Sequence, residues 1–370
     1  MNNDQKQSGA AVLGLTLALL ITTTIVTLFS AGFGAMEQRL YANEYRTKQT
    51  LEAGDAGTEY GIAYLEAHQD TIVVDADNDG YIDPYADANT HNVALSNGSV
   101  YSIQYLNPMQ NNLEIISINA TGTSSDNTTS RQMQQIVKFR STVAGMPGAP
   151  VYAKGGVELT GNSTIFNADT EQSIVSGGNI TFQGSSGTED ENGIMSDQNT
   201  TGSDIDANNA EIQAMTNDEF FSTFFGVSEE IVKANAQTGI YTTAANISSV
   251  INGIQGKLIW AEPEGGLAHI NSNTVVGSID NPVVLVINGD LKLNGGAEIY
   301  GFVYVIGNVE LGAGTALIVG SIAVGGSNFD TVGSIDSSGT IDIVYSPQVL
   351  TNIGNQVGEY SKVAASWRDF

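Results

Sequence analysis

The chain has 370 residues, of which 41% are apolar and only 14% charged, which is too apolar for a disordered chain and long enough for two or three folded units. Its 13 basic and 40 acidic residues give a formal net charge of −27. This charge argues against nucleic-acid binding and against docking on an anionic membrane surface. The absence of cysteine excludes disulfides, Cys-ligated metal centres and thiol catalysis.

The first predicted element is a membrane-anchoring helix over residues 10–35. No charged residue lies between Lys6 and Glu37. As a helix this stretch would span about 39 Å, which exceeds the hydrocarbon core of about 30 Å. Five threonines lower its hydropathy, but in a helix their hydroxyls can bond to the helix's own carbonyls. A cleaved secretory signal has a shorter apolar core of about 7–15 residues. A helix that is apolar on every face is either buried in a soluble protein or spans a membrane, and the membrane span is favoured here.

A short polar leader, residues 1–9, precedes this stretch, and a peptidase could cut between Gly9 and Ala10. The segments 6–13 (KQSGAAVL), 37–39 (EQR) and 53–57 (AGDAG), together with the apolar run, resemble the N-terminal region of PilX-type minor pilins of type IV pili. The resemblance covers about residues 5–68. It implies a subunit of pilus assembly that is anchored in the bacterial inner membrane by a single pass, with its C-terminal part in the periplasm, and that later joins other pilins in the pilus.

One position departs from the pattern of the major pilins. They carry glutamate at the fifth mature position, where it neutralises the N-terminal amine of a neighbouring subunit, whereas this chain has Gly14 there. In pilins without this glutamate, the resemblance implies a place at or near the filament tip. The leader of such a chain could also stay uncut.

The helix is expected to continue through residues 36–68, where apolar and small residues recur at helical spacing. Gly54, Gly57 and Gly61 fall on one face. Each glycine costs a helix about 1 kcal/mol relative to alanine, so three on one stripe indicate close packing against another backbone. Two partners remain open, namely other helices in a filament and a sheet of this same chain.

An acidic loop follows and predicts a calcium site. Its side-chain oxygens would come from Asp75, Asp77, Asp79 and Asp83, with the backbone carbonyl of Tyr81, at the alternating spacing of an EF-hand-type loop. Ala86 stands where that motif has its bidentate acid, and Asp87 follows one residue later, so the loop also resembles the calcium loops of thrombospondin-type repeats. We expect a structural calcium ion here; the alternative is an acidic solvated turn.

Three runs of alternating apolar and polar residues, 99–106, 113–122 and 132–141, predict an antiparallel meander. Packed on the long helix, the meander would complete a pilin-like α+β unit over residues 36–148. The Gly- and Pro-rich segment 143–150 marks the boundary to the next unit.

The C-terminal part, residues 149–370, repeats the pattern Gly-x-apolar-polar-apolar. Its copies contain the strands expected at 157–159, 180–182, 291–293, 309–311 and 341–343. Spacings near 20 residues with glycine at the corners are typical of a β-solenoid, or β-helix. An irregular Gly-rich β-sandwich is the alternative.

A helical insertion is expected at about residues 185–256. Thr216 and Glu219 form a capping box, a second helix starts at Ser228, and the four phenylalanines between them predict a buried aromatic cluster rather than a binding surface. The closing segment 360–370 is expected to cover one end of the solenoid.

No phosphate-binding loop, nucleophile elbow or paired-histidine metal motif is present, so the sequence predicts no enzyme. The favoured function is a minor pilin-like subunit in type IV pilus assembly or structure, with an acidic β domain that projects for assembly or for adhesion to a surface receptor or glycan. Two alternatives stay open, a membrane-tethered or secreted β-helical adhesin and a glycan-active β-helix enzyme.

Overall fold

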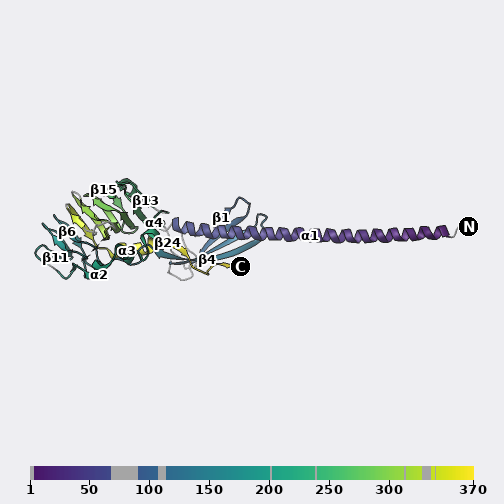
Figure 1. Ribbon diagram of the computed structural model, residues 1–370, viewed down its shortest axis with the longest axis horizontal. Helices are drawn as coiled ribbons and strands as arrows, with labels where there is room; N and C mark the ends of the chain where they lie inside the picture. Colours follow the sequence, from purple (N-terminus) through teal and green to yellow (C-terminus); the bar gives the residue numbers. More distant parts are fainter. Residues whose placement is uncertain are drawn as a thin grey trace.

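The computed structural model of the chain describes residues 4–67, 91–106, 114–200, 202–237, 240–311, 314–326, 335–337 and 339–370. One long helix projects from one end of the molecule, an antiparallel sheet lies against its C-terminal part, and two parallel sheets lie beyond (Figure 1). The chain is therefore an apolar helix followed by a mainly β body.

The helix α1 runs over Asp4–Ala67, which is 64 residues or about 96 Å. From Gln49 onward it packs on an antiparallel sheet with the order β1-β2-β3-β4-β24, and β25 also pairs with β4. The strands are β1 His91–Ala94, β2 Val100–Leu106, β3 Ile115–Thr123, β4 Ser130–Ser141, β24 Gly358–Lys362 and β25 Arg368–Asp369. The predicted meander corresponds to β2, β3 and β4, and the helix with this sheet forms the predicted α+β unit.

Two further sheets consist of parallel ladders, apart from the antiparallel hairpin β10–β11. The small parallel sheet has the order β15-β18-β20-β22-β6-β9. Its strands are β6 Val157–Leu159, β9 Ile180–Phe182, β15 Leu267–Ile270, β18 Asp290–Leu293, β20 Val309–Leu311 and β22 Ile335–Ser337.

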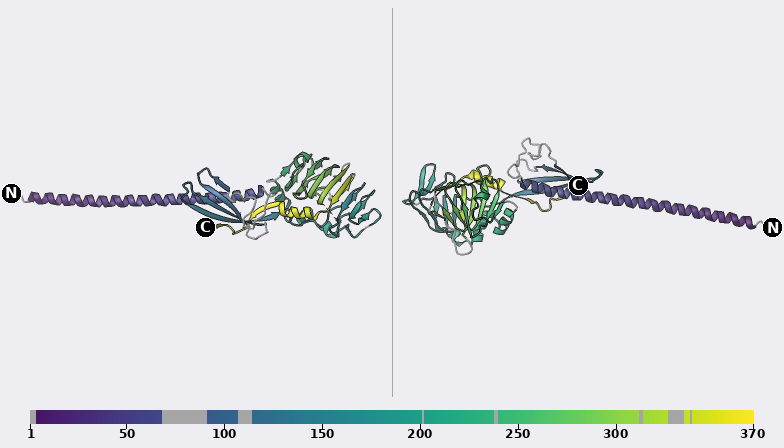
Figure 2. Two further views of the ribbon diagram at one scale, coloured as in Figure 1. Left: turned by 180° about the vertical axis from the view of Figure 1, so that it is seen from behind. Right: turned by 90° about the horizontal axis from the view of Figure 1, so that it is seen from above.

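The large parallel sheet has 13 strands and the main order β11-β10-β7-β23-β21-β19-β17-β14-β13. Its strands are β5 Val151–Ala153, β7 Thr164–Phe166, β8 Ile174–Ser176, β10 Gly187–Asp190, β11 Gly193–Asp197, β12 Ile205–Asp206, β13 Ile240–Thr242, β14 Leu258–Ala261, β16 Val275–Val276, β17 Val283–Asn288, β19 Glu298–Ile306, β21 Thr315–Val324 and β23 Thr340–Val344. The chain passes back and forth between the two parallel sheets, as the left view of Figure 2 shows.

The stacking order of the strands differs from their order in the chain. In the large sheet β5 pairs with β8 and also with β21, and in the small sheet β6 pairs with β9 and with β22. Strands from the end of the parallel region in the chain, β21 and β22, thus lie directly beside strands from its beginning, β5 and β6. The segment between β12 and β14 carries the chain from one end of the stack to the other.

Apolar side chains fill the space between the two parallel sheets and also cover the opposite face of the large sheet. Along β17, Val283, Leu285 and Ile287 face the small sheet, whereas the residues between them face the other way. That outer face is covered by α3 and α6 among others. The helices after α1 are α2 Ala210–Ala214, α3 Asn217–Phe225, α4 Glu229–Gln237, α5 Ser248–Ile251 and α6 Pro347–Gln356.

Every copy of the predicted glycine repeat contains a strand, although not all copies lie in one sheet. The copies at 157–159, 180–182, 291–293 and 309–311 are β6, β9, β18 and β20 of the small sheet, whereas 341–343 lies in β23 of the large sheet. Gly289 and Gly307 adopt φ values of 147° and 155°. A Cβ on Gly307 would lie 2.4 Å from the carbonyl oxygen of Gly289, so these corners stack too closely for any other residue.

The closing segment differs from its prediction. Residues 358–362 and 368–369 form β24 and β25, which pair with β4 of the antiparallel sheet and not with an end of the parallel stack. Tyr360 is buried there, with its ring centroid 5.3 Å from that of Phe139 in an edge-on contact. The end of the chain therefore lies in the sheet that packs on the helix.

Candidate functional site

The N-terminal half of α1 presents a long apolar surface. We call residues 11–36 the apolar segment; it contains no charged side chain. Its 13 large apolar side chains keep between 48% and 73% of their surface exposed on all sides of the helix. Burying a side chain of this kind contributes about 1.5–3 kcal/mol, so covering the segment is worth on the order of 20 kcal/mol. Among the described residues α1 is the one helix long and apolar enough to cross a membrane.

The threonines of the apolar segment satisfy their hydroxyl groups within the helix, as the sequence predicted. Thr22 donates to the carbonyl oxygen of Ala18 at 2.7 Å, and Thr24 donates to that of Leu20 at 2.7 Å. Thr16, Thr23 and Thr27 make the same kind of bond. Because these polar groups need no water, they do not oppose contact of the helix with lipid or with other apolar helices.

A charged stretch separates the apolar segment from the sheet. We call residues 37–48 the neck; it carries acidic and basic side chains on an exposed helix, and Lys48 lies 3.5 Å from Glu44. Burial begins at Gln49, which is 3% exposed. The neck is about 18 Å long, which exceeds a lipid headgroup layer of about 6 Å. A protein with the apolar segment in a bilayer would thus hold its sheets clear of the headgroups.

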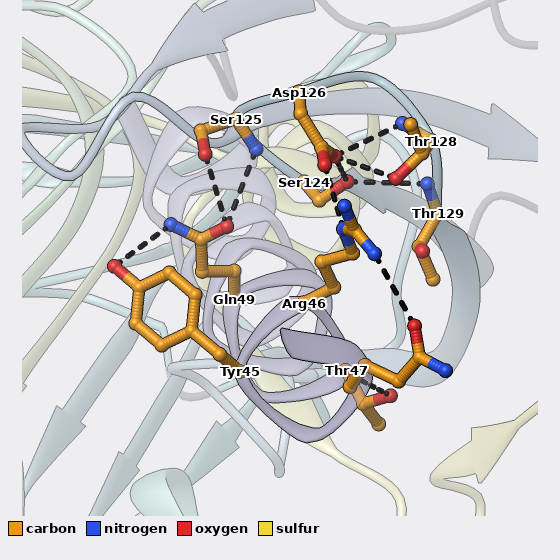
Figure 3. Close-up of polar contacts among 10 residues, drawn as sticks. Tyr45, Arg46, Thr47, Gln49, Ser124, Ser125, Asp126, Thr128 and Thr129 are labelled. Carbon is orange, nitrogen blue, oxygen red and sulfur yellow. Dashed lines mark hydrogen bonds and ion pairs between the residues drawn. The ribbon is translucent and has the colours of Figure 1, made fainter. Parts of the chain in front are cut away.

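Polar contacts tie the base of the neck to the turn between β3 and β4 (Figure 3). Arg46 Nε donates to Asp126 Oδ2 at 2.6 Å. The Gln49 Oε1 accepts from the backbone N–H and the hydroxyl of Ser125 at 3.3 and 3.1 Å, and its Nε2 donates to the hydroxyl of Tyr45 at 3.2 Å. We call this set the neck–turn cluster. It fixes the direction in which α1 leaves the sheet.

Asp126 is the centre of the neck–turn cluster. Its Oδ1 accepts from the hydroxyls of Thr128 and Ser124 at 2.7 and 2.8 Å. These hydrogen bonds, with a further contribution from the one donated by Arg46, hold the pKa of the Asp126 carboxyl well below its usual value of 3.8. The carboxylate is therefore ionised over the physiological pH range and keeps Arg46 in place.

The glycine stripe of α1 packs on the chain's own sheet. A Cβ added to Gly54, Gly57 or Gly61 would lie 2.6, 3.0 and 2.8 Å from side-chain atoms of Met133, Ala120 and Ile118, respectively. The sequence left two packing partners open for this stripe, other helices or a sheet of the same chain, and in the structure the partner is the sheet. Any packing against other helices involves the apolar segment instead. A Cβ added to Gly14, Gly32 or Gly34 would have no neighbouring atom within 4 Å.

The predicted processing site lies near the start of the helix. Gly9 and Ala10 fall within α1, whose described residues begin at Asp4. Gly14, the fifth residue from Ala10, has open space around its Cβ position. This chain alone therefore gives no steric reason for glycine instead of glutamate at that position.

The predicted calcium loop lies outside the described residues. Asp75, Asp77, Asp79, Tyr81 and Asp83 all fall within 68–90, so the calcium site stays a prediction. In the described part of the chain, no three His, Asp or Glu side chains are grouped so that they could hold a metal ion.

The aromatic cluster of the insertion is a core, as predicted. Phe220, Phe221, Phe224 and Phe225 of α3 are at most 3% exposed and pack on Tyr304 of β19. Thr216 caps the helix through the predicted capping box with Glu219. The backbone N–H of Glu219 donates to the Thr216 hydroxyl at 3.1 Å, and the backbone N–H of Thr216 donates to the Glu219 carboxylate at 2.8 Å. This cluster holds α3 on the large sheet, and its four phenylalanine rings are too buried to meet a partner.

The sequence reasoning missed the neck–turn cluster. The signal for it was present only in part, because Ser124-Ser125-Asp126 before Thr128 is typical of a turn held by side-chain bonds. Its helical partners lie about 80 residues earlier in the chain, and no local pattern connects them.

Comparisons with known proteins add a weak likeness among the solved structures. No family model matches the chain, and no curated protein matches it. Among the solved structures, it is similar to the competence-associated pilin ComZ from Thermus thermophilus, with 12% sequence identity, a TM-score of 0.26, and coverage of 88% of this chain and 97% of that chain. At this TM-score the likeness carries no argument, so the function has to be argued from the geometry of α1.

Proposed function

We propose that this protein is a minor pilin-like subunit of a type IV pilus. The apolar segment anchors the chain in the bacterial inner membrane, with a single pass and the sheets in the periplasm. It then packs among the helices of other pilins in the filament and at the cell surface. The antiparallel and parallel sheets form the part that projects outward, in a structural and not a catalytic role.

One observation carries the proposal. The apolar segment is exposed on every side, yet it is continuous with a helical half that is buried along a single stripe on the antiparallel sheet. A helix that only anchored a soluble domain would not need to be built into that domain's core. A helix that must place the domain at a fixed angle on a filament needs both halves in one rigid element.

Several finer parts of the proposal rest on the sequence. These are kinship to PilX-type minor pilins, cleavage between Gly9 and Ala10, a place near the filament tip because Gly14 replaces glutamate, and a calcium ion held by the loop 75–83. We interpret the stacked parallel turns as a β-solenoid-like domain, which is supported by the glycine corners and by the parallel registers of the small sheet. A surface receptor or glycan is the ligand class we propose for this domain, and its net negative charge argues against nucleic acid.

Membrane anchoring is tested by extraction of the full chain from cell membranes at alkaline pH. We expect the protein to stay in the membrane pellet. Replacing Leu19 and Ile25 together by arginine costs about 2.5–3.5 kcal/mol for each residue in a bilayer and should release it. Leu40→Arg, in the neck, is the matched control and should leave extraction unchanged. Release of the unmodified chain would contradict the proposal.

Incorporation into a filament is tested with single cysteines, since the chain has none of its own. Leu19→Cys lies in the apolar segment and Ser272→Cys on an exposed turn of the parallel domain. Each is labelled with a photoactivatable maleimide in isolated pili. We expect Leu19→Cys alone to cross-link to another pilin. Equal cross-linking from both positions, or none from Leu19→Cys, would contradict packing through the apolar segment.

Processing is tested by mass spectrometry of the mature N-terminus. We expect a chain that begins at Ala10 and has lost nine residues. A start near Gly32 would instead support the alternative of a secreted β-helical adhesin.

The calcium loop is tested by thermal unfolding of the full chain in detergent micelles. Chelation should lower the melting temperature, and part of that effect should be lost in Asp77→Ala. A melting curve that chelator leaves unchanged would rule out the calcium ion.

A further inference from the structure

A polar cavity lies at the end of the parallel stack, where β8 pairs with β12 and where the hairpin β10–β11 closes the large sheet. Its volume is about 500 Å³. The cavity is lined by Thr170, Glu171, Met195, Gly202, Ser203 and Asp204. None of its lining residues belongs to the predicted calcium loop or to the apolar segment, and nothing in the proposed function uses it.

Asp204 is the unusual residue of this cavity, because its side chain is almost fully buried with no basic partner. It is 3% exposed. Its Oδ1 accepts from the hydroxyl of Ser196 at 2.7 Å, and that hydroxyl oxygen in turn accepts from the N–H of Gly202 at 2.7 Å. Its Oδ2 is buried and accepts no hydrogen bond, and none of the ion pairs within the described ranges involves Asp204. A buried charge of this kind is costly unless a cation accompanies it.

Two other unpaired oxygens belong to residues that are hydrogen-bonded to the Asp204 segment. The Oε1 of Gln172 and the hydroxyl of Ser173 are buried and have no hydrogen-bond partner. Both residues are tied to the Asp204 segment, because the N–H of Ser173 donates to the Asp204 carbonyl at 2.7 Å and Gln172 Nε2 donates to the Ser203 carbonyl at 3.2 Å. The bond from Nε2 fixes the orientation of the Gln172 amide, so that its oxygen is the atom left unpaired.

The loop that carries Thr170, Glu171 and Gln172 is held in shape from within. Asn167, which is 1% exposed, donates from Nδ2 to the Thr170 hydroxyl at 2.7 Å and to the Gln172 carbonyl at 2.9 Å. Its Oδ1 accepts from the N–H of Thr170 at 3.1 Å. The oxygens around the cavity are thus positioned before any ligand arrives, which lowers the entropic cost of binding.

We propose that this cavity binds a Ca²⁺ ion through Asp204. Ca²⁺ takes six to eight oxygen ligands from carboxylates, amide and backbone carbonyls, and water, in a flexible geometry. Asp204 Oδ2 has free acceptor capacity, Glu171 supplies a second carboxylate at the cavity wall, and water completes the coordination sphere. Gln172, the neighbour of Glu171 in the chain, carries a further unpaired oxygen, Oε1. A water molecule alone would leave the Asp204 charge uncompensated, whereas a divalent cation neutralises it.

The test uses the full chain in detergent micelles with CaCl2 as the probe. The Asp77→Ala background removes the predicted loop site, so that Ca²⁺ binding in this background reports on the cavity. By isothermal titration we expect one bound Ca²⁺ per chain in this background and none after the further change Asp204→Asn. Glu171→Gln should weaken binding at least tenfold, and MgCl2 should bind more weakly than CaCl2 because Mg²⁺ demands a stricter geometry.

Thermal unfolding separates a binding role of Asp204 from a structural one. Asn is nearly isosteric with Asp and removes the buried charge, so Asp204→Asn should melt at or above the temperature of its parent without calcium, yet gain nothing from added calcium. Absence of calcium binding in the folded Asp77→Ala protein would overturn the proposal, and so would calcium binding that persists after Asp204→Asn. The second result would mean that the ion binds without the Asp204 carboxylate.

Discussion

The backbones of α1 and the antiparallel sheet approach each other closely at Gly122 of β3. An added Cβ there would lie 2.1 Å from the carbonyl oxygen of Thr50 and 2.6 Å from the backbone nitrogen of Gly54. Both are backbone atoms of a regular helix and cannot rotate away. Gly122→Ala must therefore push α1 off the sheet at the base of the neck, and overpacking of this kind typically costs about 1–3 kcal/mol.

Two matched variants separate this effect from a general response to glycine replacement. In Gly61→Ala the new methyl group meets Ile118 Cγ2 at 2.8 Å, the end of a side chain that can shift, and alanine favours the helix by about 1 kcal/mol, so we expect a small net change. In Gly14→Ala nothing lies within 4 Å, and the sheet should not respond at all.

Hydrogen exchange measured by mass spectrometry is the suitable assay, because it reports on the antiparallel sheet while peptides from the parallel sheets serve as an internal reference. A loss of 1–3 kcal/mol raises the exchange rate of amides that open with the sheet by about 5- to 150-fold. We expect this increase in β3 and β4 for Gly122→Ala and little change for the other two variants. Equal exchange in Gly122→Ala and the unmodified chain would show that the helix is not held at the distance described here.

Three further predictions concern single interactions. The pKa of Asp126 is lowered in the folded chain, so its stabilising effect is fully present above the usual value of 3.8 and is lost as the pH falls from there through the lowered pKa of the folded state. Asp126→Asn should lower the melting temperature equally at pH 7 and pH 5 and by progressively less below pH 3.8; a loss that stays constant down to pH 2 would refute the electrostatic argument. Phe221 is fully buried, stacked on Phe225 at 4.3 Å, so Phe221→Ala should cost about 3–5 kcal/mol in denaturant unfolding, with Phe221→Leu as the milder control. Thr216→Ala removes the cap of α3 and should cost about 1 kcal/mol, whereas Thr216→Ser should retain it.

The local elements could be predicted because their signals lie within a few residues. The apolar run and its helical continuation predicted α1, and the alternation of apolar residues predicted β2, β3 and β4. Thr216 and Glu219, three residues apart, identified the start of α3. In each case the physical cause, burial of one face or a cap on free N–H groups, repeats at a fixed short spacing.

The pairing of distant segments could not be predicted, because a repeat shows that strands stack but not which strand lies beside which. The copy at 341–343 has the same pattern as the others, yet it lies in the large sheet beside β21. Tyr360 alternates with polar neighbours as any edge strand would, and nothing near it indicates β4 as its partner. The cavity around Asp204 likewise depends on three segments that meet only in the fold.

The route of the chain bears on how force and orientation pass between the helix and the parallel domain. The chain leaves the antiparallel sheet after β4 and returns to it as β24, and the two crossings are bonded to each other, since the N–H of Thr142 donates to the Val357 carbonyl at 2.9 Å. The N–H groups of Ala144 and Gly145 also donate to the carbonyl of Phe224 in α3. A single linker would let the parallel domain rotate about the sheet, whereas two bonded crossings resist rotation. A load applied through α1 is therefore transmitted to the parallel domain in a defined direction, which is what a subunit that holds a projecting domain on a filament requires.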